Sequence, residues 1–273
     1  MHPPVRGLPG GPVNPTRLVI GTNRWRHSLP SALKERLLQE QCWVDTAEVY
    51  GLGRSELTVG ELGAGIPVAT KIMPWWWRSP KNLPRYSEQC RRRLRRDMLD
   101  LLLLHFPARR ASGGWLQALA AEAFEGRATA VGLSEYTLPQ LREAVRVLHP
   151  EGIQPRVVQI EVSPWQPNAL RSGMIPFCNA HNIEIWGFRV LGGGALFGQP
   201  RNAHQAGVQK ALAGVCARTG MSPVSVVIAW LRFYGIVPML GVRSLTHLEQ
   251  ALNAREADLP PQERQAFEAA VFA

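Results

Sequence analysis

The sequence predicts a (β/α)8 barrel, because eight short apolar runs alternate with amphipathic stretches along the whole chain. The runs are nearly continuously apolar, as parallel strands are when helices cover them on the outside. A barrel of this kind takes about 250 residues, so a chain of 273 residues holds one and leaves no room for a second domain. No G-x-G-x-x-G motif follows the first run, which argues against an open dinucleotide-binding sheet.

The strands are predicted where the apolar runs lie, and each run defines one of them. In chain order they are 17–22 (RLVIGT), 42–47 (CWVDTA), 67–71 (PVATK), 99–105 (LDLLLLH), 128–134 (ATAVGLS), 157–162 (VVQIEV), 183–188 (IEIWGF) and 236–241 (IVPMLG).

Helices are predicted in the amphipathic stretches between the strands and after the last strand. Ser55, Thr137 and Ser222 are predicted as N-caps, and Pro223 fits the first turn of its helix. The predicted helices are 31–40, 55–63, 83–97, 114–125, 137–147, 168–181, 205–219, 222–234, 245–253 and 260–270.

The chain is basic, with 31 Lys and Arg residues against 21 Asp and Glu and a formal net charge of +10. The basic residues are scattered, which is typical of a solvated surface, so no nucleic-acid partner is expected. The densest cluster, 90–96 (CRRRLRR), is predicted to form the solvated face of a helix. The positive charge would also attract an anionic ligand, such as a phosphorylated cofactor.

The four cysteines follow no metal-binding or redox spacing, so reduced thiols, a cytoplasmic location and no metal site are expected. No apolar run reaches about 18 residues, so no membrane span is expected. Residues 1–16 contain Pro and Gly but no apolar segment. They are expected to form a flexible arm, not a signal peptide, ahead of a single domain over 17–273.

Polar residues stand at or near the C-terminal ends of three predicted strands, where a barrel builds its active site. Asp45 lies in the second strand, Lys71 ends the third and His105 the fourth, while Tyr50 follows in the loop after Asp45. A tyrosine with a pKa of about 10 is too weak an acid to act alone near neutral pH. A lysine cation beside it would lower that pKa, and a carboxylate would hold the lysine in place. These four residues are therefore predicted to form a proton-transfer set.

Six sequence strings, in order along the chain, carry a family resemblance. They are DTAEVYG with a following SE, ATK, DLLLLHFP, AVGLSEY, VVQIEVSP and GVRSLTHLEQAL. Over roughly residues 17–270 the chain resembles the aldo-keto reductase superfamily. The resemblance implies an NADP-dependent oxidoreductase that reduces aldehydes and ketones to alcohols. It places Asp45, Tyr50, Lys71 and His105 in the family's catalytic positions, with Tyr50 as the general acid.

The resemblance also implies a site for the nicotinamide ring. Ser134, Glu135 and Gln159 match the residues that hold the nicotinamide carboxamide, although many members have Asn where this chain has Glu135. Phe188 matches the aromatic residue that stacks on the ring, and core packing is the other reading of this residue.

The ribose and pyrophosphate positions are matched less regularly. Gly21 and Thr22 match the turn beneath the nicotinamide ribose. The segment after Phe188 includes Arg189, Leu191 and Gly193 and departs from the usual Ser-Pro-Leu, but its glycines would let the backbone approach the pyrophosphate.

The segment that starts at Gly241 is predicted to bind the adenosine phosphate, because it leads into a helix whose N–H groups attract anions. Arg243 is the candidate for a 2′-phosphate, and His247 and Gln250 could add contacts. Ala251 stands where the family usually has Asn against the adenine. NADP is therefore expected, with NAD as the less favoured cofactor.

The substrate is expected to be a small carbonyl compound, bound at an open and shallow mouth because the loop after His105 is short. Trp75, Trp76 and Trp77 follow the lysine strand and could form an apolar substrate wall or cover the outer helices. Two other functions stay open on the same fold: a cofactor-binding regulatory subunit and a redox-neutral biosynthetic enzyme. The protein is expected to be a monomer.

Overall fold

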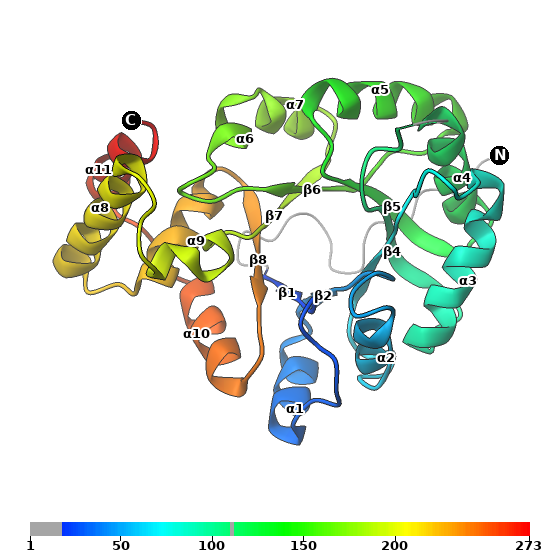
Figure 1. Cartoon of the computed structure of the whole chain (residues 1–273), viewed down its shortest axis with the longest axis horizontal. Helices are drawn as coiled ribbons and strands as arrows, with labels where there is room; N and C mark the ends of the chain where they lie inside the picture. The colour runs from blue at the N-terminus through cyan, green and yellow to red at the C-terminus, as the bar shows by residue number, and fades with distance from the viewer. Residues whose placement is uncertain (1–17, 110–111) are drawn as a thin grey trace.

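Eight parallel strands close into a barrel in the order β1-β2-β3-β4-β5-β6-β7-β8 (Figure 1). This computed structural model describes residues 18–109 and 112–273, so the predicted N-terminal arm lies outside the described residues. The predicted (β/α)8 class and all eight strands are confirmed. The strands are β1 (Val19–Gly21), β2 (Trp43–Asp45), β3 (Val68–Ile72), β4 (Leu99–Leu104), β5 (Ala128–Ser134), β6 (Val157–Glu161), β7 (Glu184–Phe188) and β8 (Ile236–Gly241).

The strand register brings the polar strand ends to one level of the barrel. Asp45 pairs with Gly21 on one side and with Ala69 on the other, while Ser134 pairs with Gln159. Because all the strands run in the same direction, their carboxyl ends share one rim. Side chains from segments far apart in the sequence therefore gather there.

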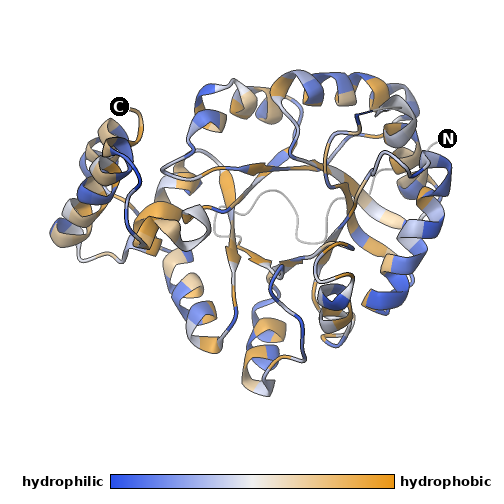
Figure 2. Ribbon diagram, viewed as in Figure 1, coloured by the Kyte–Doolittle hydropathy of each residue, from blue (hydrophilic) through white to orange (hydrophobic). Residues whose placement is uncertain are grey.

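The barrel interior is a packed core and not a pore. Trp43 and Trp186 meet edge to face inside it, with ring centroids 5.3 Å apart, a geometry that aromatic pairs favour. The strands are mostly orange in Figure 2, while α3 and α5 carry much blue, as expected for helices with one face in water. The buried residues of the interior cluster are Val19, Trp43, Ala69, Leu101, Leu103, Ala130, Val157, Trp186, Val237 and Met239.

Helices cover the barrel in the predicted positions, with one exception. The helix expected over 168–181 is two helices, because Gly173 adopts a left-handed φ of 79° between them. Glycine takes this conformation without the strain that a Cβ atom imposes. The α-helices are α1 (Ser31–Glu40), α2 (Arg54–Gly60), α3 (Leu83–Leu94), α4 (Ser112–Phe124), α5 (Leu138–Leu148), α6 (Asn168–Arg171), α7 (Met174–Ala180), α8 (Ala203–Thr219), α9 (Pro223–Phe233), α10 (Leu245–Arg255) and α11 (Pro261–Val271), and the 3-10 turns are η1 (Pro80–Asn82), η2 (His149–Glu151) and η3 (Gly192–Phe197).

Two predicted N-caps are confirmed and one is wrong. Ser222 accepts a hydrogen bond from the backbone N–H of Ser225, and Thr137 forms a capping box with Gln140. Ser55 lies inside α2, whose N-cap is Gly53. The Ser55 hydroxyl is buried and instead contacts the hydroxyls of Thr22 and Thr46.

The arginine cluster of α3 is only partly a solvated face. The side chain of Arg92 is 78% exposed, but that of Arg96 is 7% exposed and pairs with Asp100. Arg93 reaches inward to Glu56, whose side chain is fully buried, at 2.5 Å. The prediction was wrong for these two arginines. Arg93 lies beside Glu56 of α2, against which α3 packs, because a buried carboxylate needs a cation beside it. Arg96 turns to the partly exposed Asp100 of β4.

Within residues 18–109 and 112–273, no single helix is long and apolar enough to cross a membrane. Only α8 and α9 taken together, across a bend of 100°, have the length and composition for one. The same residues include no cluster of His, Cys, Asp and Glu side chains suited to a metal ion.

Candidate active site

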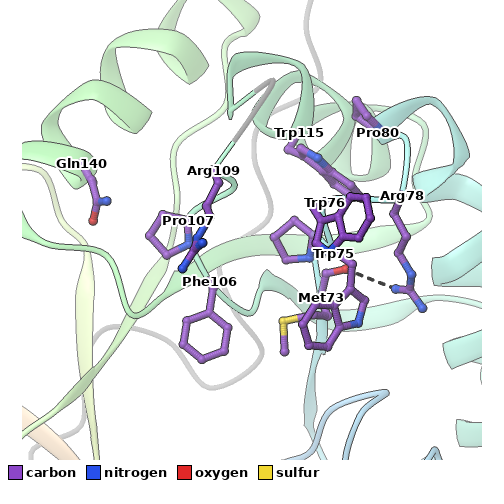
Figure 3. A pocket seen from close by; sticks show the side chains of 11 residues that line it. Met73, Trp75, Trp76, Arg78, Pro80, Phe106, Pro107, Arg109, Trp115 and Gln140 are labelled. Carbon is purple, nitrogen blue, oxygen red and sulfur yellow. Dashed lines mark hydrogen bonds between the residues drawn. The ribbon is translucent and has the colours of Figure 1, made fainter.

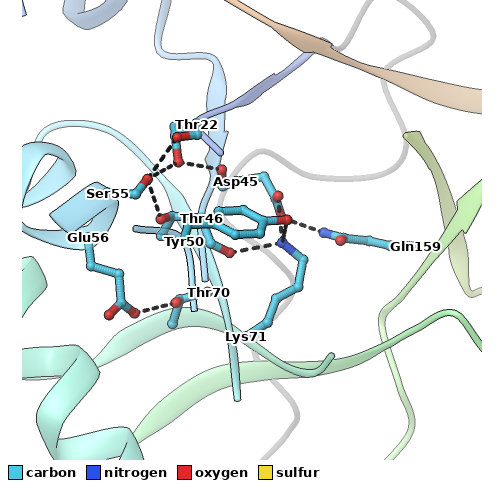
Figure 4. A network of polar contacts seen from close by, with 9 residues as sticks. All are labelled: Thr22, Asp45, Thr46, Tyr50, Ser55, Glu56, Thr70, Lys71 and Gln159. Carbon is cyan, nitrogen blue, oxygen red and sulfur yellow. Dashed lines mark hydrogen bonds and ion pairs between the residues drawn. The ribbon is translucent and has the colours of Figure 1, made fainter. Parts of the chain in front are cut away.

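Lys71 stands at the centre of a buried polar network at the carboxyl rim of the barrel (Figure 4). Its Nζ donates to Asp45 Oδ2 at 2.6 Å, to the Thr46 carbonyl oxygen at 2.9 Å and to the Tyr50 hydroxyl oxygen at 3.3 Å. Asp45 ends β2, Lys71 lies in β3, and a turn with Tyr50 N–H bonded to the Ala47 carbonyl returns the tyrosine over the rim. The structure thus brings together three of the four residues expected to transfer protons.

Asp45 and Lys71 form a buried ion pair, with side chains only 1% and 2% exposed. Burial by itself would lower the pKa of Lys71, but the attraction of Asp45 and Tyr50 outweighs it and the pKa lies above the usual value. Burial raises the pKa of Asp45, and Lys71 and Gln159 offset part of this rise. Removing either partner would leave an uncompensated buried charge, which is strongly unfavourable.

The pKa of Tyr50 differs from the expectation. Burial raises it above its usual value, and the Lys71 cation, which favours tyrosinate, offsets only part of that rise. The negative charges of Asp45 and Glu135 act in the same direction as burial. The expected lowering of this pKa by lysine is therefore present as one contribution, but desolvation is the larger one.

His105 follows β4 directly and lies beside Tyr50, with the two rings edge to face and their centroids 5.7 Å apart. Burial, together with the Lys71 cation, lowers the pKa of His105 from 6.5 to about 3. The imidazole is therefore neutral near pH 7. Its Nδ1 is buried and has no hydrogen-bond partner among the described residues, so a polar group of a ligand could complete it.

Gln159, expected at the nicotinamide carboxamide, lies at the rim and contacts the catalytic candidate Asp45. Its Nε2 donates to Asp45 Oδ1 at 2.6 Å, and the residue is 1% exposed. With Lys71 on the other carboxylate oxygen, both oxygens of Asp45 are bonded. The contact was not anticipated, since nothing in the sequence links β6 to β2.

The other residues expected at the nicotinamide also gather on this rim. Ser134 ends β5 and is buried, and Glu135 follows it with a left-handed φ of 62°. Burial raises the pKa of Glu135, the negative charge of Glu161 raises it further, and Arg189 opposes both. Arg189 pairs with Glu161 at 3.2 Å. Phe188 is half-buried at the end of β7 and packs against the barrel interior. Part of its side chain therefore belongs to the core, and the rest is exposed at the rim.

The segments expected at the ribose and pyrophosphate flank this group. Thr22 is buried and its hydroxyl donates to the Asp45 carbonyl oxygen at 2.9 Å, while Gly21 pairs with Gly241 of β8. Leu191 caps η3, and Gly193 adopts a left-handed φ of 69° within it.

The helix expected at the adenosine phosphate is α10. Ser244 is its N-cap and accepts from the His247 N–H at 3.2 Å. Arg243 is exposed and makes no ion pair with any residue in the described ranges. His247 and Gln250 are exposed on α10, whereas Ala251 is buried in the core.

Two parts of the site were not predicted from the sequence. The Thr22 and Ser55 hydroxyls lie 2.6 Å apart, and Ser55 donates to the Thr22 carbonyl oxygen at 2.9 Å, which ties α2 to the loop after β1. Glu48 is buried and accepts from the Met73 N–H at 2.7 Å and from Arg78. The signal in the sequence was the position of Glu48, an acidic residue two places before Tyr50 in an otherwise buried segment between strand and loop.

Two of the three adjacent tryptophans line a groove of about 700 Å³ beside the rim (Figure 3). Trp77 lies outside its lining but stacks on Trp75, with ring centroids 4.9 Å apart. Trp76 is 77% exposed, so it does not serve as cover for the outer helices. The apolar lining is Met73, Pro74, Trp75, Trp76, Pro80, Phe106, Pro107 and Trp115.

Comparison with known proteins places the chain in a family. The model of the Aldo/keto reductase family matches residues 31–271, which is most of the chain. The chain belongs to the aldo/keto reductase family. It is therefore an oxidoreductase of that family.

Its relatives among aldo/keto reductases are distant. The chain is 27% identical over 263 residues to "Methylglyoxal reductase DkgB" of Escherichia coli O157:H7, which covers 92% of this chain and 91% of that protein. It is 27% identical to "NAD/NADP-dependent indole-3-acetaldehyde reductase" of Schizosaccharomyces pombe, over 83% of this chain and 78% of that protein.

Solved aldo/keto reductases have the same fold. The thermostable aldo-keto reductase Tm1743, solved with the inhibitor epalrestat, matches with a TM-score of 0.79 at 20% identity, over 97% of this chain and 98% of that one. An aldo/keto reductase from Klebsiella pneumoniae, solved with NADP and acetate, matches with a TM-score of 0.74 at 20% identity, over 92% and 90%.

Proposed function

We propose that this aldo/keto reductase reduces aldehydes or ketones to alcohols with NADPH, and that Tyr50 is the general acid. The observation that carries the proposal is that Lys71 Nζ contacts both Asp45, at 2.6 Å, and the Tyr50 hydroxyl, at 3.3 Å. This is the arrangement by which a cation stabilises the tyrosinate left behind when a proton is given up. The names of the two relatives described above, a methylglyoxal reductase and an indole-3-acetaldehyde reductase, support the same reaction.

The residues around the rim fit NADP. Arg243 offers a guanidinium at the start of α10, where backbone N–H groups also favour a phosphate. The buried, unpartnered Nδ1 of His105 indicates that a polar ligand completes the rim. Gly193 and its glycine neighbours in η3 bring backbone without side chains to the same side. NADPH, when bound, supplies the hydride.

Each protein residue then has one task. Tyr50 O–H donates its proton to the carbonyl oxygen, which becomes the alcohol hydroxyl. Lys71 stays protonated and stabilises the tyrosinate, while Asp45 holds the lysine in place. His105, neutral near pH 7, forms a hydrogen bond to the carbonyl oxygen and fixes its direction.

The test is NADPH consumption by the purified protein with a panel of carbonyl compounds that includes methylglyoxal and indole-3-acetaldehyde. Turnover in the wild type and its loss in Tyr50→Phe are expected. NADPH binding without turnover of any carbonyl compound would contradict the proposal and favour a regulatory or redox-neutral role.

A further inference from the structure

The groove beside the rim is built from two facing walls (Figure 3). Trp75 and Trp76, from the loop after β3, stand on one side with Trp115 of α4, and Phe106 stands on the other. Trp75, Trp76 and Phe106 are 38%, 77% and 41% exposed. A cluster of large aromatic side chains exposed to solvent marks a binding surface. Two walls of flat aromatic rings fit a flat occupant.

The tryptophan wall is anchored before any ligand arrives. Glu48 is buried, and it accepts from the Met73 N–H at 2.7 Å and from Arg78, which lies just after the tryptophans. Arg78 also donates to the Met73 carbonyl oxygen at 3.2 Å. The Glu48 carboxylate therefore joins the two ends of the tryptophan loop, Met73 and Arg78. A loop ordered in advance loses less conformational entropy when a ligand binds.

The groove adjoins the proposed catalytic residues through Phe106, which lines it. Phe106 stacks on His105 with ring centroids 5.1 Å apart, and His105 in turn meets Tyr50 at 5.7 Å. A carbonyl group held between Tyr50 and His105 would therefore have the rest of its molecule beside Phe106. Glu48 lies in the same loop as Tyr50, two residues before it, and holds the tryptophan wall through its bond to the Met73 N–H.

The charges that line the groove indicate which charge its ligand carries. Two cations, Arg78 and Arg109, line it, and no carboxylate belongs to its described lining. Arg78 is neutralised by Glu48, whereas Arg109 is exposed and makes no ion pair within the described part of the chain. A guanidinium free in this way is suited to a carboxylate.

We propose that this groove binds the body of the substrate, and that the substrate is a carbonyl compound with a flat aromatic ring system and a carboxylate. The proposal rests on the reductase function above. The carbonyl lies at Tyr50 and His105, the rings lie between Phe106 and the tryptophans, and the carboxylate meets Arg109.

The experiment compares three substrates that differ in one feature each: propanal, 2-naphthaldehyde and 6-formyl-2-naphthoate. The wild type is expected to have the highest kcat/KM for 6-formyl-2-naphthoate and the lowest for propanal. Trp76→Ala is expected to lower kcat/KM for both naphthalene substrates about tenfold more than for propanal, from the lost ring contact. Arg109→Gln is expected to lower kcat/KM for 6-formyl-2-naphthoate about tenfold more than for 2-naphthaldehyde.

Phe233→Ala is the matched control, since Phe233 is 59% exposed at the end of α9, on the other side of the barrel (Figure 1). The proposal would be overturned if Trp76→Ala lowered kcat/KM equally for propanal and the naphthalene substrates. It would also be overturned if Phe233→Ala lowered kcat/KM for the naphthalene substrates as much as Trp76→Ala does. Binding of 2-naphthoate, measured by calorimetry, separates this proposal from the reductase function. Weaker binding in Trp76→Ala than in Phe233→Ala supports the groove even without turnover, and unchanged binding overturns it.

Discussion

Gln159 and Asp45, 114 residues apart in the sequence, share a hydrogen bond of 2.6 Å across the barrel rim. This bond satisfies the carboxylate oxygen that Lys71 does not reach, so Asp45 is held from β3 and β6 at once. The carboxylate thereby fixes the lysine beneath Tyr50.

Tyr50→Phe is expected to lower kcat for carbonyl reduction by about 10²–10⁴-fold, the usual loss when a general acid is removed. NADPH affinity should stay near that of the wild type. Steady-state kinetics and a fluorescence titration measure the two quantities. Tyr234→Phe, which removes a hydroxyl bonded to Glu268 away from the rim, is the control. Near-normal turnover in Tyr50→Phe would exclude this tyrosine as the proton donor.

Lys71→Met is expected to abolish turnover and to lower the free energy of unfolding by about 3–5 kcal/mol, because Asp45 would remain as a buried unpaired carboxylate. The double variant Asp45→Asn with Lys71→Met removes both charges and should recover much of that stability. It should not recover turnover, since no cation would remain beside Tyr50. Urea unfolding and kinetics on both variants check this; a folded, active Lys71→Met protein would contradict the mechanism.

Gln159→Met is expected to lower the free energy of unfolding by about 1.5–3 kcal/mol, the range for a hydrogen bond to a charged group. The replacement keeps the volume but leaves Asp45 Oδ1 without its donor. Urea unfolding measures the change, and Gln117→Met on the exposed face of α4 is the control, expected within about 0.5 kcal/mol of the wild type. An equal effect in both variants would show that the bond to Asp45 contributes nothing.

His105 is expected to make the protein less stable as the pH falls below neutrality. Its pKa is about 3 when folded against 6.5 for an ordinary histidine, so between these values the unfolded chain binds the extra proton. Stability therefore rises with pH through this window. His105→Gln should weaken that dependence, measured as the free energy of unfolding at several pH values. An unchanged slope would mean that the folded His105 titrates normally.

Wild-type protein is expected to bind NADPH about ten- to a hundredfold more tightly than NADH, because a charge-assisted contact is worth roughly 1.5–3 kcal/mol. Arg243→Ala should remove most of this preference, whereas Arg85→Ala, an exposed arginine on α3, should not. Fluorescence titration with each cofactor gives the ratio. Equal affinities in the wild type, or an unchanged ratio in Arg243→Ala, would show that Arg243 does not read the 2′-phosphate.

The sequence alone determined the barrel and the gathering of its polar strand ends. Apolar runs alternating with helical stretches favour parallel strands, and parallel strands place residues such as Asp45 and Lys71 on one rim whatever their distance in sequence. The chemistry of Tyr50 and His105 beside them predicted the proton-transfer set, and the resemblance added the role of each residue. These inferences needed only local pattern and strand direction.

Only the tertiary structure decided which side chains meet and how burial changes them. The Gln159–Asp45 bond, the Ser55–Thr22 contact and the pairing of Arg93 with Glu56 join segments that no local pattern connects. The direction of the Tyr50 pKa also followed from packing, because desolvation of this half-buried residue outweighs the nearby Lys71 cation. Desolvation depends on every atom around a group, so it is fixed by the folded chain and not by the residues adjacent in sequence.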